Sequence, residues 1–374
     1  MQVKSAVLRE SGLDTPYAKS QPIKIETLEL DAPKQGEVLI QIKAASLCHS
    51  DLSVINGSRP RPLPMALGHE ASGVVVETGE GVTGLEPGDY IVCVFVPSCG
   101  HCLPCKEGRP ALCETGAKTN NEGTLISGGN RLHAGDEVIN HHLGVSAFSE
   151  YAVVAQNSVI KVDKDIAFDQ AALFGCAVIT GVGAVVNTAN IKLGNTVAIV
   201  GLGGVGLSAL IGAVSAGASR IVAVDLNEKK LKQAKELGAT DTFNSSDENA
   251  SDQIREATDG GLDYVFETAG AVPAMEVAYA ITKRGGTTVT TGLPDPKHHF
   301  SFPYVNLTAE EKTLKGSYVG SCVPDRDIPR FINLFKRDRL HVDQLVTEKI
   351  ALDEINEGFD KLAHGESSRI IIKF

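Results

Sequence analysis

The first third of the chain alternates short hydrophobic and polar runs. The run Glu37-Val-Leu-Ile-Gln-Ile-Lys43 is typical, and Pro and Gly separate it from its neighbours. Alternation with a period of two places apolar side chains on one face of a half-buried β-strand. Together with the runs at 72–77, 90–95 and 151–154, this pattern predicts a loop-rich domain of mainly antiparallel strands.

The pattern changes between residues 196 and 225. An apolar run rich in β-branched residues, 197–200, is followed by Gly201-Leu-Gly-Gly-Val-Gly206, by small residues of helical character, and by a second apolar run, 221–224. This order predicts a strand, a glycine turn, a helix and a second strand. Helical and strand patterns then continue to alternate, which indicates a parallel sheet covered by helices.

The glycines of this turn have separate physical roles. Gly201 permits the tight bend, Gly203 lets the backbone approach a pyrophosphate, and Gly206 lets the helix pack closely on the strand. Free N–H groups and the positive end of the helix dipole then face the phosphates. Asp225, nineteen residues after Gly206, can accept hydrogen bonds from ribose hydroxyls and would repel a 2′-phosphate. The turn therefore predicts NAD and disfavours NADP.

Two other interpretations of this segment are weaker. A glycine turn also occurs in α/β proteins that bind no dinucleotide, but here the strand, the helix and the acidic residue agree. Residues 195–219 carry no charge, and they exceed the roughly 18 apolar residues of a membrane span. Six glycines within 201–217 favour a buried strand–helix unit instead.

Bulk properties narrow the classes of function. A chain of 374 residues favours two domains, and 43% hydrophobic with 22% charged residues is typical of soluble globular proteins. The net charge of −11 argues against the basic face that a nucleic acid requires. No signal-peptide pattern is visible at the N-terminus. We therefore expect a cytoplasmic protein that binds neither nucleic acid nor membrane.

Half of the eight cysteines fall within fifteen residues: Cys99, Cys102, Cys105 and Cys113. Two-residue gaps let successive thiolates turn toward one centre, and the fourth can complete a tetrahedron. Four protein ligands leave no open position, so this pattern predicts a structural zinc site, with a redox or disulfide cluster as the alternative. Cys93 and Cys322 are expected in the core. The polar, glycine-rich segment 114–140 is expected to be a long functional loop.

Two shorter clusters add candidate chemistry. Cys48-His49-Ser50-Asp51 places a thiol, an imidazole, a hydroxyl and a carboxylate at consecutive positions, and Gly68-His69-Glu70 precedes a predicted strand. Each cluster taken alone has a plain structural interpretation, because a histidine at a strand end is more often a satisfied structural residue than a ligand.

In this order, the motifs resemble those of the zinc-containing medium-chain alcohol dehydrogenases, in the branch with a long loop. The resemblance runs end to end and includes LGHE, the CxxCxxCx7C run, FSEY, FGC, GLGGVG and the terminal SSRIIIKF. It implies an α/β protein that combines a Rossmann doubly wound parallel sheet with a GroES-like catalytic domain of mostly antiparallel β-structure. The expected divisions are 1–177 for the catalytic domain with both zinc sites, 178–319 for NAD binding, and 320–374 returning to the catalytic domain.

The resemblance also implies residue roles and two zinc ions per chain. The catalytic zinc would be held by Cys48, His69 and Cys176. Its fourth position would take water or the substrate oxygen. Glu70 would lie behind the metal and Asp51 would orient the metal-bound histidine. Ser50 would take the alcohol proton as hydride passes to the nicotinamide.

Around NAD, the resemblance implies contacts at the glycine turn and beyond it. These are Gly201, Gly203, Gly204, Val205, Gly206 and Asp225 at the turn, and His49, Thr180, Lys230, Thr291, Leu293, Ser317, Val319 and Arg369 elsewhere. Lys230 is expected near the adenosine ribose, and His49 and Arg369 near the pyrophosphate. Because Lys230 lies on a lysine-rich helix face, a solvated side chain is the alternative.

The substrate pocket implied by the family is mostly apolar: Phe95, His142, Leu143 and Leu293. Such a lining suits a medium aliphatic or aromatic primary alcohol, oxidised reversibly to the aldehyde. S-(hydroxymethyl)glutathione is the alternative substrate, but residues 114–118 lack the arginine that this branch uses to hold an anion.

Further expectations concern the proton relay and the assembly. Ser53 stands where many members have the histidine that ends the relay, so the relay must end elsewhere, at His49 or solvent. The family implies a homo-oligomer, with a dimer favoured over a tetramer. A zinc-stabilised NAD-binding scaffold is the non-enzymatic alternative, and the presence of every catalytic ligand together with Ser50 argues against it.

Overall fold

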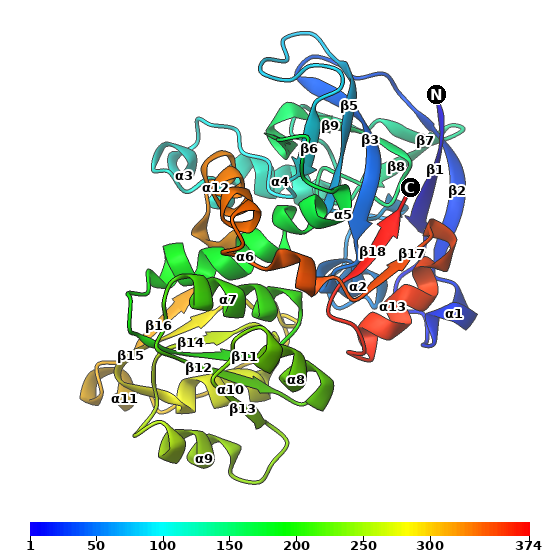
Figure 1. The fold of residues 1–374 in the computed structure, drawn as a ribbon. Coiled ribbons are helices and arrows are strands. Elements are labelled where there is room, and N and C mark those ends of the chain that lie inside the picture. The colour runs from blue at the N-terminus through cyan, green and yellow to red at the C-terminus, as the bar shows by residue number, and fades with distance from the viewer. The chain divides into compact units, whose positions relative to one another are not determined.

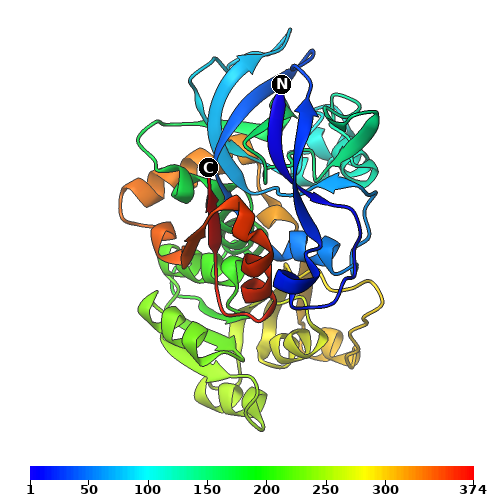
Figure 2. The same cartoon turned by 90° about the vertical axis from the view of Figure 1, so that its right-hand side faces the viewer.

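The computed structural model describes residues 1–374, and the chain divides into two compact units. The first unit contains Met1–Cys176, Val323–Ile332 and Val346–Phe374, and the second contains Ala177–Cys322 and Asn333–Leu345. Both termini belong to the first unit, where Figures 1 and 2 show strand β1 (Gln2–Leu8) beginning the chain and β18 (Ile370–Lys373) ending it.

Antiparallel pairing dominates the first unit. Its other strands are β2 (Ile23–Leu30), β3 (Glu37–Ser46), β4 (Met65–Ala66), β5 (Ala71–Thr78), β6 (Tyr90–Cys93), β7 (Leu132–Ala134), β8 (Glu137–His141), β9 (Tyr151–Ala155), β10 (Val159–Val162) and β17 (Glu348–Ile350). A closed barrel has the order β1-β2-β7-β8-β4, and a seven-stranded sheet has the order β10-β6-β5-β3-β18-β17, with β9 also paired to β3. The alternating runs of the sequence therefore do form strands.

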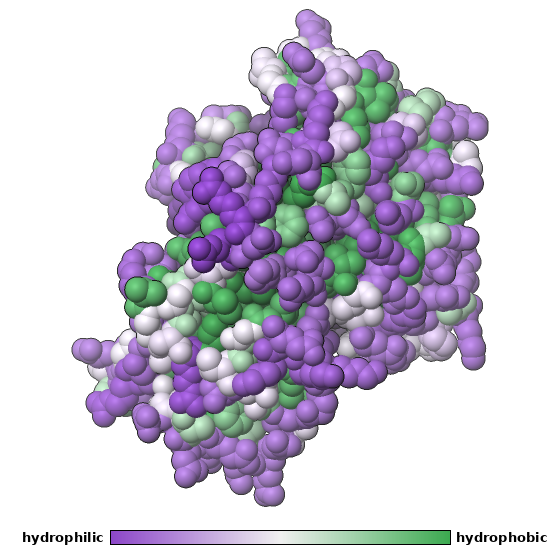
Figure 3. Space-filling model, viewed as in Figure 1, coloured by the Kyte–Doolittle hydropathy of each residue, from purple (hydrophilic) through white to green (hydrophobic).

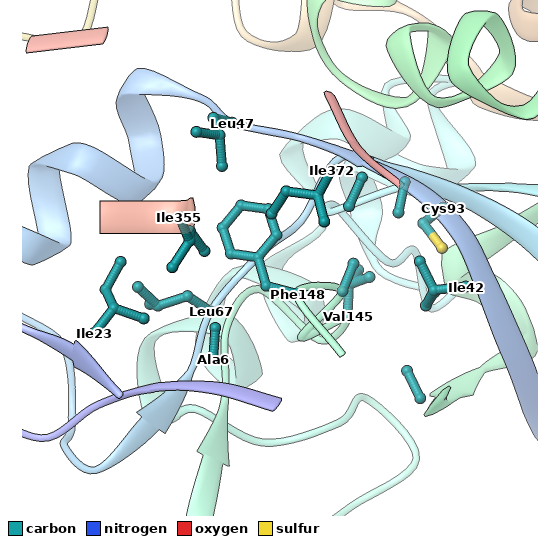
Figure 4. Close-up of a cluster of buried hydrophobic side chains, with 14 of the residues drawn as sticks. Ala6, Ile23, Ile42, Leu47, Leu67, Cys93, Val145, Phe148, Ile355 and Ile372 are labelled. Carbon is teal, nitrogen blue, oxygen red and sulfur yellow. The ribbon is translucent and has the colours of Figure 1, made fainter. Parts of the chain in front are cut away.

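A continuous hydrophobic cluster fills the interior of this unit. Phe148 is fully buried, and Figure 4 shows it among Leu67, Val145 and Ile372. Removal of such side chains from water is the main force that holds strands together. Cys93 lies in the same cluster, and Cys322 is fully buried in the second unit. Both orphan cysteines are therefore core residues, as predicted.

The second unit is built on a parallel sheet. Its strands are β11 (Thr196–Val200), β12 (Arg220–Asp225), β13 (Asp241–Asn244), β14 (Leu262–Glu267), β15 (Thr282–Thr290) and β16 (Thr313–Gly316). They run parallel in the order β13-β12-β11-β14-β15-β16. The strand order reverses between β11 and β14, and ligands of doubly wound sheets bind at the carboxyl ends of strands beside this reversal.

The helices are mostly short. Those of the first unit are α1 (Tyr17–Ser20), α2 (His49–Ile55), α3 (Leu103–Lys106), α4 (Glu114–Glu122), α5 (Phe168–Ala171) and α13 (Ile355–Ala363); the second unit has α6 (Ala177–Gly183), α7 (Gly204–Ser215), α8 (Glu228–Glu236), α9 (Ala250–Ala257), α10 (Val272–Ala280) and α11 (Val305–Ala309). Helix α12 (Pro324–Lys336) contributes residues to both.

The prediction of a long loop at 114–140 was wrong. The segment contains α4 and the antiparallel pair β7–β8, which is part of the barrel. Helix α4 buries only Gly116 and Asn120, so its sequence lacks the apolar stripe from which a helix could be predicted. Its N-terminus is capped by the Cys113 side chain, which accepts a hydrogen bond from the backbone N–H of Gly116.

The hydrophobic segment 195–219 is divided between β11, the glycine turn and α7. No single helix is long and apolar enough to cross a bilayer, and Phe168–Gly175 with Ala177–Ala189 meets the criteria of length and composition only as a bent pair. The face of the molecule drawn in Figure 3 is mostly hydrophilic, with smaller hydrophobic areas between the polar ones.

Candidate active site and metal centres

The first turn of α2 fixes one side of the candidate site. Cys48 is the N-cap residue of this helix, and the carboxylate of Asp51, three residues later, accepts a hydrogen bond of 3.2 Å from the Cys48 backbone N–H. A carboxylate in the first turn also interacts favourably with the helix dipole. This local capping holds the Cys48 thiol and the Asp51 carboxylate in a fixed relation.

A turn before β5 supplies the imidazole. Gly68 has φ of +95°, and a Cβ there would lie 2.4 Å from the backbone nitrogen of Phe148, so only glycine fits. The N–H of Gly68 donates to Asp51 Oδ1 at 3.3 Å. His69 Nδ1 lies 3.0 Å from the same oxygen. The structure thus brings the Asp51 carboxylate to the His69 ring, the contact that the role implied by the family resemblance requires.

Three potential metal ligands converge at this point. The ligand atoms of Cys48, His69 and Cys176 all lie within 4.8 Å of one another, and all three residues are buried. His69 Nε2 is buried without any hydrogen-bond partner, a costly state unless another group satisfies it. Two thiolates and one imidazole are the donor set of a catalytic zinc that keeps an open position. These residues fit zinc.

The three candidate ligands interact strongly through their protons, and the pKa of Cys176 is raised well above its ordinary value by its hydrogen bond to Cys48 and by burial. A hydrogen bond from the Cys176 thiol lowers the pKa of Cys48 well below its ordinary value, with help from His69. Burial opposes the charged form of His69, but the nearby charges of Asp51 and Cys48 raise its pKa well above the usual range. Zinc binds thiolates and neutral imidazole, so a bound ion would replace the protons on the thiols and on Nε2 of His69.

A buried ion pair adjoins the thiols. Arg369 Nη1 lies 3.1 Å from Glu70 Oε2 and donates to the carbonyl oxygen of Leu47 at 3.2 Å. Burial opposes the charge of Arg369, but Glu70, Cys48 and Cys176 raise its pKa. The family resemblance implied that Arg369 lies near a pyrophosphate. In the structure Nη1 is held by Glu70 and Leu47, and Nε has no hydrogen-bond partner.

The four clustered cysteines also converge. The sulfur atoms of Cys99, Cys102, Cys105 and Cys113 all lie within 4.8 Å of one another. The backbone N–H of Cys102 donates to the Cys99 sulfur at 3.3 Å, and that of Cys99 donates to the Cys113 sulfur at 3.2 Å. Despite desolvation, backbone hydrogen bonds lower the pKa of Cys99 to about 5. A closed set of four thiolates is the donor set of a structural zinc.

Comparison with known proteins agrees with this geometry. Residues 34–164 match the model of the alcohol dehydrogenase GroES-like domain, and residues 204–337 match that of the zinc-binding dehydrogenases. The NDMA-dependent alcohol dehydrogenase of Amycolatopsis methanolica is 40% identical over 100% of this chain and 99% of its own. The chain belongs to the zinc-containing alcohol dehydrogenase family.

Two solved structures of this family cover the whole fold. An alcohol dehydrogenase zinc-binding domain protein from Burkholderia ambifaria is 34% identical with a TM-score of 0.93, over 100% of this chain and 99% of that one. The benzyl alcohol dehydrogenase of Acinetobacter calcoaceticus is 32% identical, with the same TM-score and coverage. The first unit is therefore the GroES-like domain of a zinc alcohol dehydrogenase and the second its Rossmann domain.

The glycine turn of the Rossmann domain has the geometry that a dinucleotide site requires. Gly201 has φ of +92°, and a Cβ at Gly206 would lie 1.9 Å from the carbonyl oxygen of Gly201. Asp225 ends β12, and its carboxylate accepts hydrogen bonds from the backbone N–H groups of Leu202 at 2.6 Å and Asn227 at 2.9 Å. These bonds hold the carboxylate beside the turn.

The other residues expected around NAD are distributed over both units. Val205 and Lys230 are half-buried, Thr180 and Val319 are buried, and Leu293 is half exposed. Backbone groups of Thr291 and Ser317 are already bonded, since the N–H of Thr291 donates to Glu267 and that of Ser317 to Thr290. His49, the first residue of α2, is exposed. Their roles toward the cofactor remain predictions.

Sequence reasoning missed Glu267, which is buried at the end of β14. One carboxylate oxygen accepts from the Gly270 N–H at 2.6 Å, and the other accepts from the Thr290 hydroxyl at 2.7 Å. It thus joins the turn after β14 to the last residue of the neighbouring strand β15, at the carboxyl ends of the two strands. The only signal in the sequence was a glutamate at the end of a predicted strand.

The expected pocket residues of the GroES-like domain are all buried: Phe95, His142 and Leu143. The ring of Phe95 packs edge-on against His69, with centroids 5.2 Å apart. His142 differs from a simple lining residue, because its Nδ1 lies 3.0 Å from Asp51 Oδ1. Ser53, the position of the missing relay histidine, donates its hydroxyl to the carbonyl oxygen of His49 at 2.8 Å.

Proposed function

We propose that this zinc alcohol dehydrogenase oxidises primary alcohols of medium aliphatic or aromatic type to aldehydes, reversibly and with NAD. The observation that carries the proposal is the convergence of the Cys48 and Cys176 thiols with Nε2 of His69, a buried nitrogen that has no hydrogen-bond partner in the protein. Bound at this site, zinc supplies a Lewis acid for the alcohol oxygen, and the nicotinamide supplies the hydride acceptor.

The residues of this chain would divide the remaining work. Cys48, His69 and Cys176 would hold the metal, and Asp51 keeps His69 in the tautomer that carries its proton on Nδ1. Ser50, on the first turn of α2, would accept a hydrogen bond from the alcohol and remove its proton. A serine cannot act as the terminal base at neutral pH, and the Ser53 hydroxyl is bonded to the backbone carbonyl oxygen of His49, so we infer that the proton leaves through the His49 imidazole or directly to solvent.

An apolar lining supports the choice of substrate. Phe95 and Leu143 offer no charge to an anionic substrate, and both are less than a tenth exposed. A similar protein, 32% identical over its full length, is a benzyl alcohol dehydrogenase. Benzyl alcohol is therefore the first substrate to test.

The choice of NAD is supported by Asp225. A carboxylate at the end of β12 suits free ribose hydroxyls and disfavours a 2′-phosphate. The relative that is 40% identical is NDMA-dependent, so NDMA must be included as a second oxidant in any assay.

An exposed sheet edge supports the proposed homodimer. All four residues of β16 are exposed, and they include the hydrophobic side chain of Leu314. An unpaired edge of this kind favours pairing with another strand. Size-exclusion chromatography with light scattering would test the dimer, and a monomeric mass would contradict it.

The decisive experiment is an alcohol panel followed by the absorbance of the reduced nicotinamide, and by the formation of aldehyde where NDMA is added, because NDMA would reoxidise the cofactor. It should contain benzyl alcohol, hexanol, and formaldehyde with glutathione, each with NAD, NADP, or NDMA added to NAD. We expect benzyl alcohol and hexanol to be oxidised with NAD. Turnover only of formaldehyde with glutathione would favour S-(hydroxymethyl)glutathione as substrate, and no turnover in any arm by protein with full zinc would contradict the proposal.

A further inference from the structure

Asp51 Oδ1 is shared by two imidazoles. His69 Nδ1 and His142 Nδ1 each lie 3.0 Å from this single oxygen, and the Gly68 N–H donates to it at 3.3 Å. Asp51 and His69 are fully buried, and His142 is 1% exposed. Water therefore does not screen these contacts, and the charge of one carboxylate is divided between two rings.

Asp51 is the polar group that Nδ1 of His142 faces. This nitrogen has no hydrogen-bond partner, and its approach to Asp51 has ion-pair distance without the alignment of a full hydrogen bond. The ring also packs edge-on against His69, with centroids 5.5 Å apart and an interplanar angle of 88°. Phe95 packs on His69 in a similar way, at 5.2 Å and 80°. Of these two rings, only His142 brings a ring nitrogen to the carboxylate, and because an ionised carboxylate can only accept, the favourable tautomer carries its proton on this nitrogen.

We propose that His142 is a positioning residue that acts through Asp51 on the metal ligand His69. A carboxylate bonded to a metal-bound histidine makes that histidine a stronger donor. A second N–H dipole at the same oxygen draws part of the charge away from His69. The geometry of Asp51 does not need His142, because the N–H groups of Cys48 and Gly68 already hold both carboxylate oxygens. The effect of His142 is therefore electrostatic: His69 donates less charge, and the metal is held less tightly and is more electrophilic.

Two substitutions separate the dipole of His142 from its volume. His142→Phe keeps a ring against His69 but removes the donor, and His142→Asn keeps an N–H donor at the position of Nδ1 but removes the ring. We expect zinc loss from the catalytic site to a chelator to be about three- to tenfold slower in His142→Phe. The change is smaller than the 10–100-fold effect typical of losing an outer partner, because Asp51 remains. His142→Asn should lose zinc at nearly the wild-type rate.

Phe95→Leu is the matched control, since Phe95 packs on the same imidazole and carries no donor. Zinc loss from the four-cysteine site serves as an internal reference within every variant. Unchanged rates in His142→Phe would show that His142 only fills space, and faster loss would show that it stabilises the site; either result overturns the proposal.

A second readout is the visible absorption of enzyme in which cobalt replaces the catalytic zinc. We expect the ligand-field bands to shift in His142→Phe and to return toward wild type in His142→Asn. Identical spectra for the three proteins would contradict the proposal. The inference rests on the catalytic metal proposed above, but metal content of the wild-type protein tests that independently: one zinc per chain refutes the metal site, whereas two zinc ions with unaltered loss rates refute only the role of His142.

Discussion

The side chains of Arg369 and Glu70 form an ion pair in the interior of the GroES-like domain, with Nη1 3.1 Å from Oε2. Both side chains are 3% exposed or less. The thiols of Cys48 and Cys176 also interact with Arg369 and raise its pKa. The pair therefore adjoins the proposed catalytic metal, and neither partner can recover hydration if the other is lost.

Arg369→Met should destabilise the protein by about 3–5 kcal/mol, because it leaves the Glu70 carboxylate buried without its partner. The double variant Glu70→Gln with Arg369→Met should recover part of that loss. Arg9→Met is the control: Arg9 pairs with Glu26 at 2.7 Å but is 41% exposed, so we expect at most about 1 kcal/mol. Chemical unfolding followed by circular dichroism would measure all three, and equal effects of Arg369→Met and Arg9→Met would contradict the prediction.

Removal of one ligand from each metal centre should have different results. Cys113→Ser should reduce zinc from two to one per chain and lower the unfolding temperature, since Cys113 closes the four-cysteine site and caps α4. Cys176→Ser should also retain one zinc but should abolish alcohol oxidation with a smaller effect on unfolding. Atomic absorption and thermal unfolding would check both, and two zinc ions in either variant would argue against the corresponding site.

Asp225→Asn should weaken the preference for NAD over NADP. The amide keeps the shape of the side chain and one of its two acceptors for the N–H groups of Leu202 and Asn227, but it removes the charge that would repel a 2′-phosphate. We expect the ratio of kcat/KM for the two cofactors to fall about tenfold or more, which corresponds to about 1.4 kcal/mol. Asp247→Asn removes an equal charge from an exposed site and should leave the ratio unchanged. A similar fall in both variants would mean that net charge, and not Asp225, governs the preference.

His141 should make the protein sensitive to acid. Burial, with a contribution from Arg131, lowers its pKa from 6.5 to about 4, and its Nε2 accepts a hydrogen bond of 3.1 Å from the Arg131 backbone N–H. Between pH 6.5 and 4 the unfolded chain therefore binds a proton at this histidine that the folded chain does not bind. The contribution of His141 to the free energy of unfolding is full above pH 6.5 and declines as the pH falls toward 4. Between about pH 7.5 and about pH 5.5 we expect a loss of about 1.4 kcal/mol.

His141→Gln tests this linkage, because a glutamine oxygen can accept the same hydrogen bond without titrating. Thermal unfolding of wild type and variant at the two pH values would give the difference. We expect the variant to lose less stability on acidification than the wild type does. Parallel losses in the two proteins would assign the acid sensitivity to other groups.

Features formed by residues close in sequence could be predicted from local patterns alone. The glycine turn, the four-cysteine run and the strand runs at 37–43, 72–77, 90–95, 151–154, 197–200 and 221–224 depend on local periodicity and spacing, and they were confirmed as elements or clusters. The segment 114–140 was predicted wrongly because prediction depended on local periodicity. Helix α4 buries only Gly116 and Asn120 and is stabilised by its Cys113 cap, so its sequence has no apolar periodicity. Family resemblance, rather than spacing, joined Cys48, His69 and Cys176.

By itself, the sequence determined which atoms are available for chemistry: the thiols, the imidazoles and the carboxylate that metal binding needs, and the glycine turn that a dinucleotide needs. Only the tertiary structure decided how these groups share charge. Asp51, His69 and His142 lie far apart in the chain, and burial brings both rings to one carboxylate oxygen. The strength of that interaction depends on distance and on the exclusion of water, and neither is encoded in a local pattern of residues.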